Sequence, residues 1–171
     1  MSESFVMRRK IRIAVLTVSD TRTEESDTGG ALVKSLAQQA GIDVVDYRIV
    51  KDEVKDIHGI VVSWMARGEI DAIISTGGTG IAKRDQSIEA IEPFFEKELP
   101  GFGELFRYLS FSQDIGTKAL LSRASAGTCA DKAIFILPGS RGAVKLAMER
   151  LILPEIHHLV FELGKHRQLR L

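Results

Sequence analysis

A glycine-rich segment follows one of the apolar runs of the chain and ends in a carboxylate. The segment "STGGTGIAKRD", from Ser75 to Asp85, comes directly after "IDAII". Its glycines, Gly77, Gly78 and Gly80, permit positive φ angles and let backbone N–H groups approach a ligand closely. Such a loop before a helix N-terminus can bind a phosphate group, although it can also be a simple flexible turn. The GxxxxGK[ST] and GxGxxG patterns are absent, so neither of those nucleotide-binding mechanisms is assigned.

Two aspartates follow apolar runs and precede predicted helices. Asp85 ends the glycine-rich segment, and Asp52 lies in "VKDE". Each carboxylate alone could cap the helix that follows it. If both lie at the same edge of a sheet, they could instead hold Mg²⁺ against a polyphosphate. The sequence leaves both roles open.

Further polar residues in the segments between apolar runs could contact an anion. Lys83 and Arg84 could neutralise a phosphate or remain solvated surface charges. In "LSRASAG", Arg123 follows Ser122 and could clamp an anion bidentately or form a surface ion pair. In "PGS", the N–H groups at the start of the last helix could bind an anion, while Ser140 could serve only as the N-cap.

The apolar runs themselves are predicted to be strands because they are short, β-branched and bounded by turn residues. Three of the four are apolar nearly throughout, which is typical of strands covered on both faces in a parallel sheet. Ligands bind beyond the carboxyl ends of such strands, where the polar residues above lie. The predicted strands are Ile11–Val18, Ile42–Val50, Asp71–Thr76 and Ala133–Pro138.

Apolar residues with helical spacing predict helices between and after these strands. Pro154 lacks a backbone N–H and predicts a kink or break in the last helix. Alternation of strands and helices predicts right-handed βαβ units. We therefore expect an α/β fold, a single three-layer αβα domain at 11–171 with a mostly parallel central sheet, after an N-terminal tail at 1–10. The predicted helices run from about 32 to 41, 54 to 68, 104 to 111 and 141 to 163, and a further helical segment, "QSIEAIE", follows Asp85.

Composition narrows the function classes. The 171 residues are 44% hydrophobic and 27% charged, as expected for one soluble domain, and 23 basic residues balance 23 acidic ones. This charge balance argues against a nucleic-acid or membrane partner. Without a signal-peptide pattern or a long apolar run, the protein is expected to be cytoplasmic and unprocessed. Cys129 is the only cysteine, so no intrachain disulfide can form, and the four histidines have no metal-ligand spacing.

Six ordered segments resemble the MoaB/Mog family of molybdenum cofactor biosynthesis proteins, over roughly residues 11–163. They are "VSDTRTEESDTGG", "VKDE", "TGGTGIAKRDQSIEA", "PGFGELFRYLSF", "IGTKALLSRASAGT" and "LPGSRGAVKLAMERLILPEI". The resemblance implies a single α/β domain that assembles into a homo-oligomer, a trimer or a hexamer. Active members of the family transfer AMP from Mg-ATP to the terminal phosphate of molybdopterin and release pyrophosphate. It therefore implies ATP and molybdopterin as substrates and Mg²⁺ as cofactor.

Carried over by position, the resemblance makes Asp52 and Asp85 the catalytic carboxylates and the candidate Mg²⁺ ligands. "TRTEE" and "FGELFRYLSF" are most similar to the B branch, some of whose members have lost one or both aspartates. The alternative is therefore a molybdopterin-binding or scaffold protein without turnover, although retention of both aspartates and Arg84 favours an enzyme. A general nucleotide-binding regulator would rest on fold analogy alone. The implied substrate-binding residues are Asp20, Thr76, Gly77, Gly78, Thr79, Gly80, Arg84, Ser122, Arg123, Gly139 and Ser140.

Overall fold

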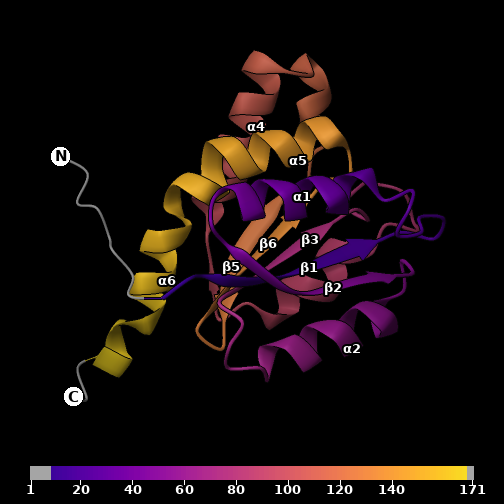
Figure 1. Ribbon diagram of the computed structural model, residues 1–171. Coiled ribbons are helices and arrows are strands. Elements are labelled where there is room, and N and C mark those ends of the chain that lie inside the picture. Colours follow the sequence, from indigo (N-terminus) through magenta and orange to yellow (C-terminus); the bar gives the residue numbers. More distant parts are fainter. Residues whose placement is uncertain (1–8, 169–171) are drawn as a thin grey trace.

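The computed structural model describes residues 9–168, which form a six-stranded sheet covered by helices on both faces (Figure 1). The strand order is β2-β1-β3-β6-β5-β4. β1, β2, β3 and β6 are parallel, while β5 is antiparallel to both of its neighbours. The predicted α/β class with a mostly parallel sheet is confirmed. The strands are β1 (Arg12–Val18), β2 (Asp43–Val50), β3 (Ala72–Thr76), β4 (Lys97–Glu98), β5 (Ser125–Cys129) and β6 (Lys132–Leu137).

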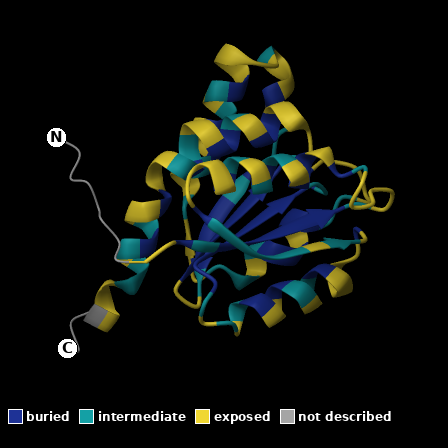
Figure 2. Cartoon of the chain, viewed as in Figure 1, coloured by how far each residue is buried: buried dark blue, intermediate teal, exposed yellow. Residues whose placement is uncertain are grey.

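Two apolar cores lie on opposite faces of the sheet. Because side chains alternate along a strand, Ile13 and Val15 of β1 enter one core, and Ala14 and Leu16 enter the other. Both cores exclude solvent from the central strands, which Figure 2 shows as buried. The first core is covered by α1 (Thr28–Gln39), α4 (Pro100–Gln113), α5 (Arg141–Ala147) and α6 (Leu153–Gln168), and the second by α2 (Val54–Met65) and α3 (Ser87–Ile91).

The predicted irregularity near Pro154 is present as a wide turn just before it. A π-helical segment, η3 (Met148–Ile152), joins α5 to α6, and the Leu153 N–H donates to the carbonyl oxygen of Met148, five residues back. Proline supplies no N–H and crowds the carbonyl one turn earlier, so a widened turn accommodates it. Figure 1 shows α6 bending away from the direction of α5 at this point.

The antiparallel part of the sheet was not predicted. β4 is only two residues long, and β5 consists of small and polar residues that give little strand signal. A two-residue turn at Ala130 and Asp131, with φ of 50° and 58°, joins β5 to β6. Such turns usually carry Asn-Gly or Asp-Gly, so Ala-Asp did not mark a hairpin. A 3₁₀ helix precedes each of the two short strands: η1 (Glu92–Phe94) comes before β4, and η2 (Gly116–Leu121) comes before β5.

Part of the predicted N-terminal tail packs against the domain. Residues 1–8 lie outside the described range, but Arg9 donates to both carboxylate oxygens of Asp71, at 2.8 and 2.7 Å. The backbone N–H of Arg12 donates to the same carboxylate at 2.9 Å. Asp71 thus links Arg9 to the first residue of β1, at the end of the sheet opposite the carboxyl ends of the parallel strands. Across residues 9–168, no helix combines the length and the hydrophobicity needed to cross a membrane.

Candidate functional site

A cleft of about 570 Å³ opens beyond the carboxyl ends of β1, β3 and β6. The loops that follow these three strands line it, together with the end of α4 and η2. This is the position expected for a ligand site in an open α/β sheet. Asp20, Asp52, Arg84 and Arg123 are not among its lining residues. The lining includes nine of the predicted site residues, namely Thr76, Gly77, Gly78, Thr79, Gly80, Asp85, Ser122, Gly139 and Ser140.

Glycines let the loops after β1, β3 and β6 touch through their backbones. Gly77 has a φ of 87°, and a Cβ there would lie 2.3 Å from the carbonyl oxygen of Val18. A Cβ on Gly139 would lie 3.2 Å from the Cα of Gly77. Side chains at these positions would push the loops apart, so part of the cleft floor is main chain.

The glycine-rich loop presents a row of free backbone donors. The Gly77 N–H donates to the carbonyl oxygen of Leu137 at 3.0 Å and continues the sheet. The next four N–H groups, those of residues 78–81, have no acceptor within the described part of the chain. Successive N–H groups without internal acceptors form a concave site suited to an anion.

Asp85 lies against this loop and faces the cleft. Its Oδ2 accepts a hydrogen bond from the Ala82 N–H at 2.9 Å, and a Cβ on Gly80 would lie 2.5 Å from the same oxygen. The N-cap position of α3 belongs to Gln86, so Asp85 does not cap that helix as one alternative expected. The second oxygen, Oδ1, accepts no hydrogen bond from the residues described.

Asp52 is buried beneath the same loop. A Cβ on Gly78 would lie 2.8 Å from its Oδ2, and its Oδ1 accepts a hydrogen bond from the Gln86 N–H at 2.9 Å. Asp52 therefore does not cap α2, the helix that follows it in sequence, although this was one of the two predicted alternatives. It accepts instead from the N-cap residue of α3. Burial is the main cause that raises its pKa, and the nearby carboxylates of Asp85 and Asp20 act in the same direction.

The two carboxylates fit a Mg²⁺ ion that arrives with a substrate. Each uses one oxygen for a backbone N–H and keeps the other free of hydrogen bonds from residues 9–168. In that same range, no group of three or more His, Cys, Asp or Glu side chains could hold a metal ion without help. Mg²⁺ is commonly held by one or two carboxylates plus substrate phosphates, so this sparse donor set is suitable.

Arg84 connects three loops outside the cleft. Its guanidinium makes a bidentate pair with Asp20, at 2.7 and 2.9 Å, and a third hydrogen bond to Glu53 at 2.7 Å. The Asp52 N–H donates to Asp20 as well, at 3.2 Å. Hydrogen bonding from Arg84 lowers the pKa of Asp20 to about 2. The structure thus brings Asp20, Asp52 and Arg84 together behind the glycine-rich loop.

The remaining predicted residues have different surroundings. Arg123 lies on the far side of the loop, where it donates to loop carbonyls and pairs with Glu89. Ser140 accepts a hydrogen bond from the Ala143 N–H at 3.2 Å, which confirms the N-cap alternative for this residue. The Ser122 hydroxyl is buried at the cleft without a hydrogen-bond partner among the residues described, and a ligand could supply one.

Sequence reasoning missed a buried carboxylate in the wall of the cleft. Asp27 caps α1 by accepting from the Gly30 N–H at 2.9 Å, and it accepts a hydrogen bond from Thr17 at 2.6 Å. The Tyr47 hydroxyl donates to the same carboxylate, and burial raises the pKa of that tyrosine. The signal available was "SDTGG", an aspartate before a helix in the loop after the first strand. Lys118 was also missed, because η2 was not predicted.

Comparisons with known proteins extend over nearly the whole chain. Residues 14–158 match a family described as a probable molybdopterin binding domain. Molybdenum cofactor biosynthesis protein B of Staphylococcus epidermidis is 56% identical over 162 residues, which are 93% of this chain and 92% of the relative. A crystal structure of molybdenum cofactor biosynthesis protein B has a TM-score of 0.90 at 48% identity and covers 95% of this chain and 100% of its own. The tungsten cofactor synthesizing protein MoaB from Pyrococcus furiosus has a TM-score of 0.78 at 34% identity, with 91% and 98% covered.

Proposed function

The chain belongs to the MoaB branch of the molybdenum cofactor biosynthesis proteins, and from this premise we propose that it is a molybdopterin adenylyltransferase. In the proposed reaction an oxygen of the terminal molybdopterin phosphate bonds to the α-phosphorus of ATP. The bond from that phosphorus to the bridging oxygen breaks, and pyrophosphate leaves with its electron pair. The products are adenylylated molybdopterin and pyrophosphate.

One observation carries the proposal most directly: the free N–H groups of residues 78–81 lie beside the carboxylates of Asp52 and Asp85. A reaction between two phosphates requires both neutralisation of negative charge and precise placement of the reacting groups. The N–H row can bind phosphate oxygens without a flexible side chain. When bound, Mg²⁺ would neutralise charge on the triphosphate, and Asp52 and Asp85 are the residues that would hold it.

The other residues would bind and orient the substrates. The buried hydroxyl of Ser122 and the backbone at Gly139 line the same cleft and can contact the second phosphate. Arg84 would fix the positions of the loops after β1 and β2 relative to Asp85, because it pairs with Asp20 in the first loop and with Glu53 in the second. No covalent intermediate with the protein is needed, because the pterin phosphate is the nucleophile.

A carrier without turnover is the second candidate. Two arginines that the resemblance assigned to substrate binding favour this candidate. The guanidinium groups of Arg84 and Arg123 are both already paired with carboxylates, so they are not free to neutralise a triphosphate. In that role the cleft would hold molybdopterin for another protein. The two candidates differ in whether ATP is consumed.

The test is to incubate the purified protein with molybdopterin and Mg-ATP and to measure adenylylated molybdopterin and pyrophosphate. We expect both products from the wild type. Asp85→Asn should lower turnover by about a hundredfold or more while changing molybdopterin affinity little, since the neutral amide is a much weaker ligand for the Mg²⁺ that neutralises the triphosphate. Molybdopterin binding without product would overturn the enzyme assignment and leave the carrier.

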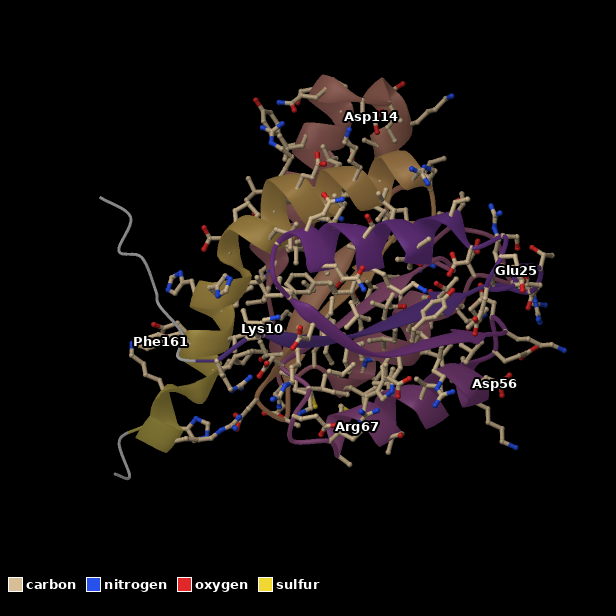
Figure 3. The ribbon with its side chains drawn as sticks, viewed as in Figure 1. Lys10, Glu25, Asp56, Arg67, Asp114 and Phe161 are labelled. Atoms are coloured by element: carbon tan, nitrogen blue, oxygen red, sulfur yellow. The ribbon has the colours of Figure 1, made fainter. Side chains whose placement is uncertain are left out.

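Asp56→Asn provides the matched control for this variant. Asp56 is an exposed aspartate on α2, labelled in Figure 3, and it does not line the cleft. The same loss of one negative charge should leave turnover unchanged there. If both variants lost activity equally, the assignment of Asp85 would be wrong.

We also propose that the protein is a cytoplasmic homo-oligomer, a trimer or a hexamer. Support comes from α4, where Leu105, Tyr108 and Phe111 are 53%, 64% and 57% exposed. Large apolar side chains grouped on one exposed helix are typical of a protein interface, and aromatic residues are enriched in such interfaces.

A further inference from the structure

We infer that Ser87 and the Arg123–Glu89 pair are positioning residues that turn the N–H groups of the glycine-rich loop toward the cleft. They act on the loop through its carbonyl groups and not on the ligand. This rests on the proposed function only in taking the bound anion to be a substrate phosphate.

All four carbonyls of residues 77–80 are held by these side chains or by the backbone of Ser87. The Ser87 hydroxyl donates to the first carbonyl at 2.7 Å, and its N–H donates to the second at 3.0 Å. Arg123 donates to the third through Nε at 3.1 Å and to the fourth through Nη2 at 2.6 Å. Acceptors and donors of the loop are therefore separated: the carbonyls are bound internally, and the N–H groups that follow them are free.

Peptide geometry links the two halves of this pattern. In a trans peptide the C=O and the following N–H point in opposite directions, and the described residues contain no cis peptide bond. Holding the carbonyls of residues 77–80 on one side thus directs the N–H groups of residues 78–81 to the other. Glycine alone would permit several orientations of these peptides, so the tethers select one.

The tethering side chains lie on the side of the loop away from the cleft. Ser87 is fully buried, and neither it nor the ion pair lines the cleft. Arg123 and Glu89 instead line a neighbouring depression with residues 81–83, Asp85 and Gln86, of which Asp85 also lines the cleft. The resemblance implied that Arg123 binds substrate, but its guanidinium already donates to two carbonyls and to both oxygens of Glu89.

Glu89 distinguishes a positioning role from a charge role. Its carboxylate aligns the guanidinium, and Arg123 in turn lowers the pKa of Glu89. If Arg123 and Glu89 acted only through charge, removing the negative charge would strengthen anion binding. If they act by holding the loop, the same change loosens Arg123 and weakens anion binding. The two roles therefore predict opposite signs.

The experiment is calorimetric titration of the full-length protein with inorganic pyrophosphate, in the absence of molybdopterin and ATP. Arg123→Lys keeps the charge but places three donors on one nitrogen, so it cannot reach both carbonyls and Glu89. We expect Arg123→Lys and Glu89→Gln each to weaken pyrophosphate binding about fivefold or more. Ser87→Thr, which keeps the hydroxyl, should bind better than Ser87→Ala.

Glu149→Gln is the matched control, because Glu149 is exposed on η3 and lies outside the cleft and away from Arg123. It removes the same charge and should leave the affinity within about twofold, as expected for a screened surface charge. Thermal unfolding of each variant checks that it is folded. Because Glu89 is partly exposed, Glu89→Gln keeps the test valid even if Ser87→Ala does not fold.

Amide NMR of residues 78–81 gives a direct reading of the loop. Pyrophosphate should shift these four amide protons in the wild type and shift them less in Glu89→Gln. Tighter pyrophosphate binding by Glu89→Gln, or wild-type affinity in Arg123→Lys, would overturn the inference even if the enzyme is active. The variants could instead show the expected loss of pyrophosphate affinity while the wild type makes no adenylylated molybdopterin. That result would support the positioning role and exclude the proposed enzymatic function.

Discussion

The Asp52 carboxyl group combines burial with two neighbouring carboxylates, and together they raise its pKa. Protonated Asp52 is therefore favoured in the folded state more than in the unfolded state. Its contribution to stability is fully present below the ordinary pKa of an aspartate and is lost as pH rises through the raised pKa. Above this raised pKa the ionised group lowers the free energy of unfolding, which is common for residues selected for chemistry.

This predicts that Asp52→Asn stabilises the protein near neutral pH while reducing turnover. The asparagine oxygen can still accept from the Gln86 N–H, and the neutral amide removes the cost of the buried charge. The difference in melting temperature, variant minus wild type, should increase as pH rises from the acidic range to neutrality. Thermal unfolding across that range measures it, with Asp56→Asn as the reference. A difference that does not change with pH would contradict the assignment.

At the scale of elements, the β5–β6 hairpin shows where sequence patterns fail. The parallel strands were predictable because burial on both faces requires continuous apolar runs such as that of β3. β5 pairs on both edges through backbone groups, which any residue can supply, so "SAGTC" carries little strand signature. Its turn holds Ala130 and Asp131 at positive φ, where the pairing of two strands imposes a conformation that neither residue prefers.

Ala130→Gly is therefore expected to stabilise the protein by about 1 kcal/mol, because glycine adopts positive φ without a Cβ clash. Ala130 is exposed, and the hydrogen bond from its N–H to Glu96 would remain. Urea unfolding measures the change. Ala40→Gly is the control: Ala40 is exposed with φ of −84°, so glycine there should not stabilise. Equal effects at both positions would rule out the conformational explanation.

For the whole molecule, the arrangement of charges explains what the sequence could and could not reveal about the site. Positions after the strands were predictable, because all parallel strands end at one edge. The partners of Arg84 and Arg123 were not, although a surface ion pair was one of the two alternatives for Arg123. Their carboxylate partners lie 31 to 64 residues away in sequence, so only the folded chain brings them together. In the sequence each arginine could bind an anion, whereas in the folded protein its guanidinium group stabilises a loop.

The exposed face of α4 leads to a prediction about assembly. Tyr108→Glu should shift the protein toward monomers in sedimentation velocity, since a charge cannot be buried in an apolar interface without a partner. Val62→Glu is the control, because Val62 is 50% exposed on α2, on the other side of the sheet. An unchanged oligomer in Tyr108→Glu, or an equal shift in Val62→Glu, would exclude α4 as the interface.

The free N–H groups of residues 78–81 imply that alanine scanning would leave the anion-binding groups themselves in place and would detect only the side chains that orient them. A backbone amide survives nearly every side-chain substitution, and it does not titrate at any pH that a cell experiences. Affinity at such a site can be altered indirectly, through the side chains that orient the peptides. It can be altered directly only by changing the main chain, and replacing single amides with esters would remove these donors one at a time.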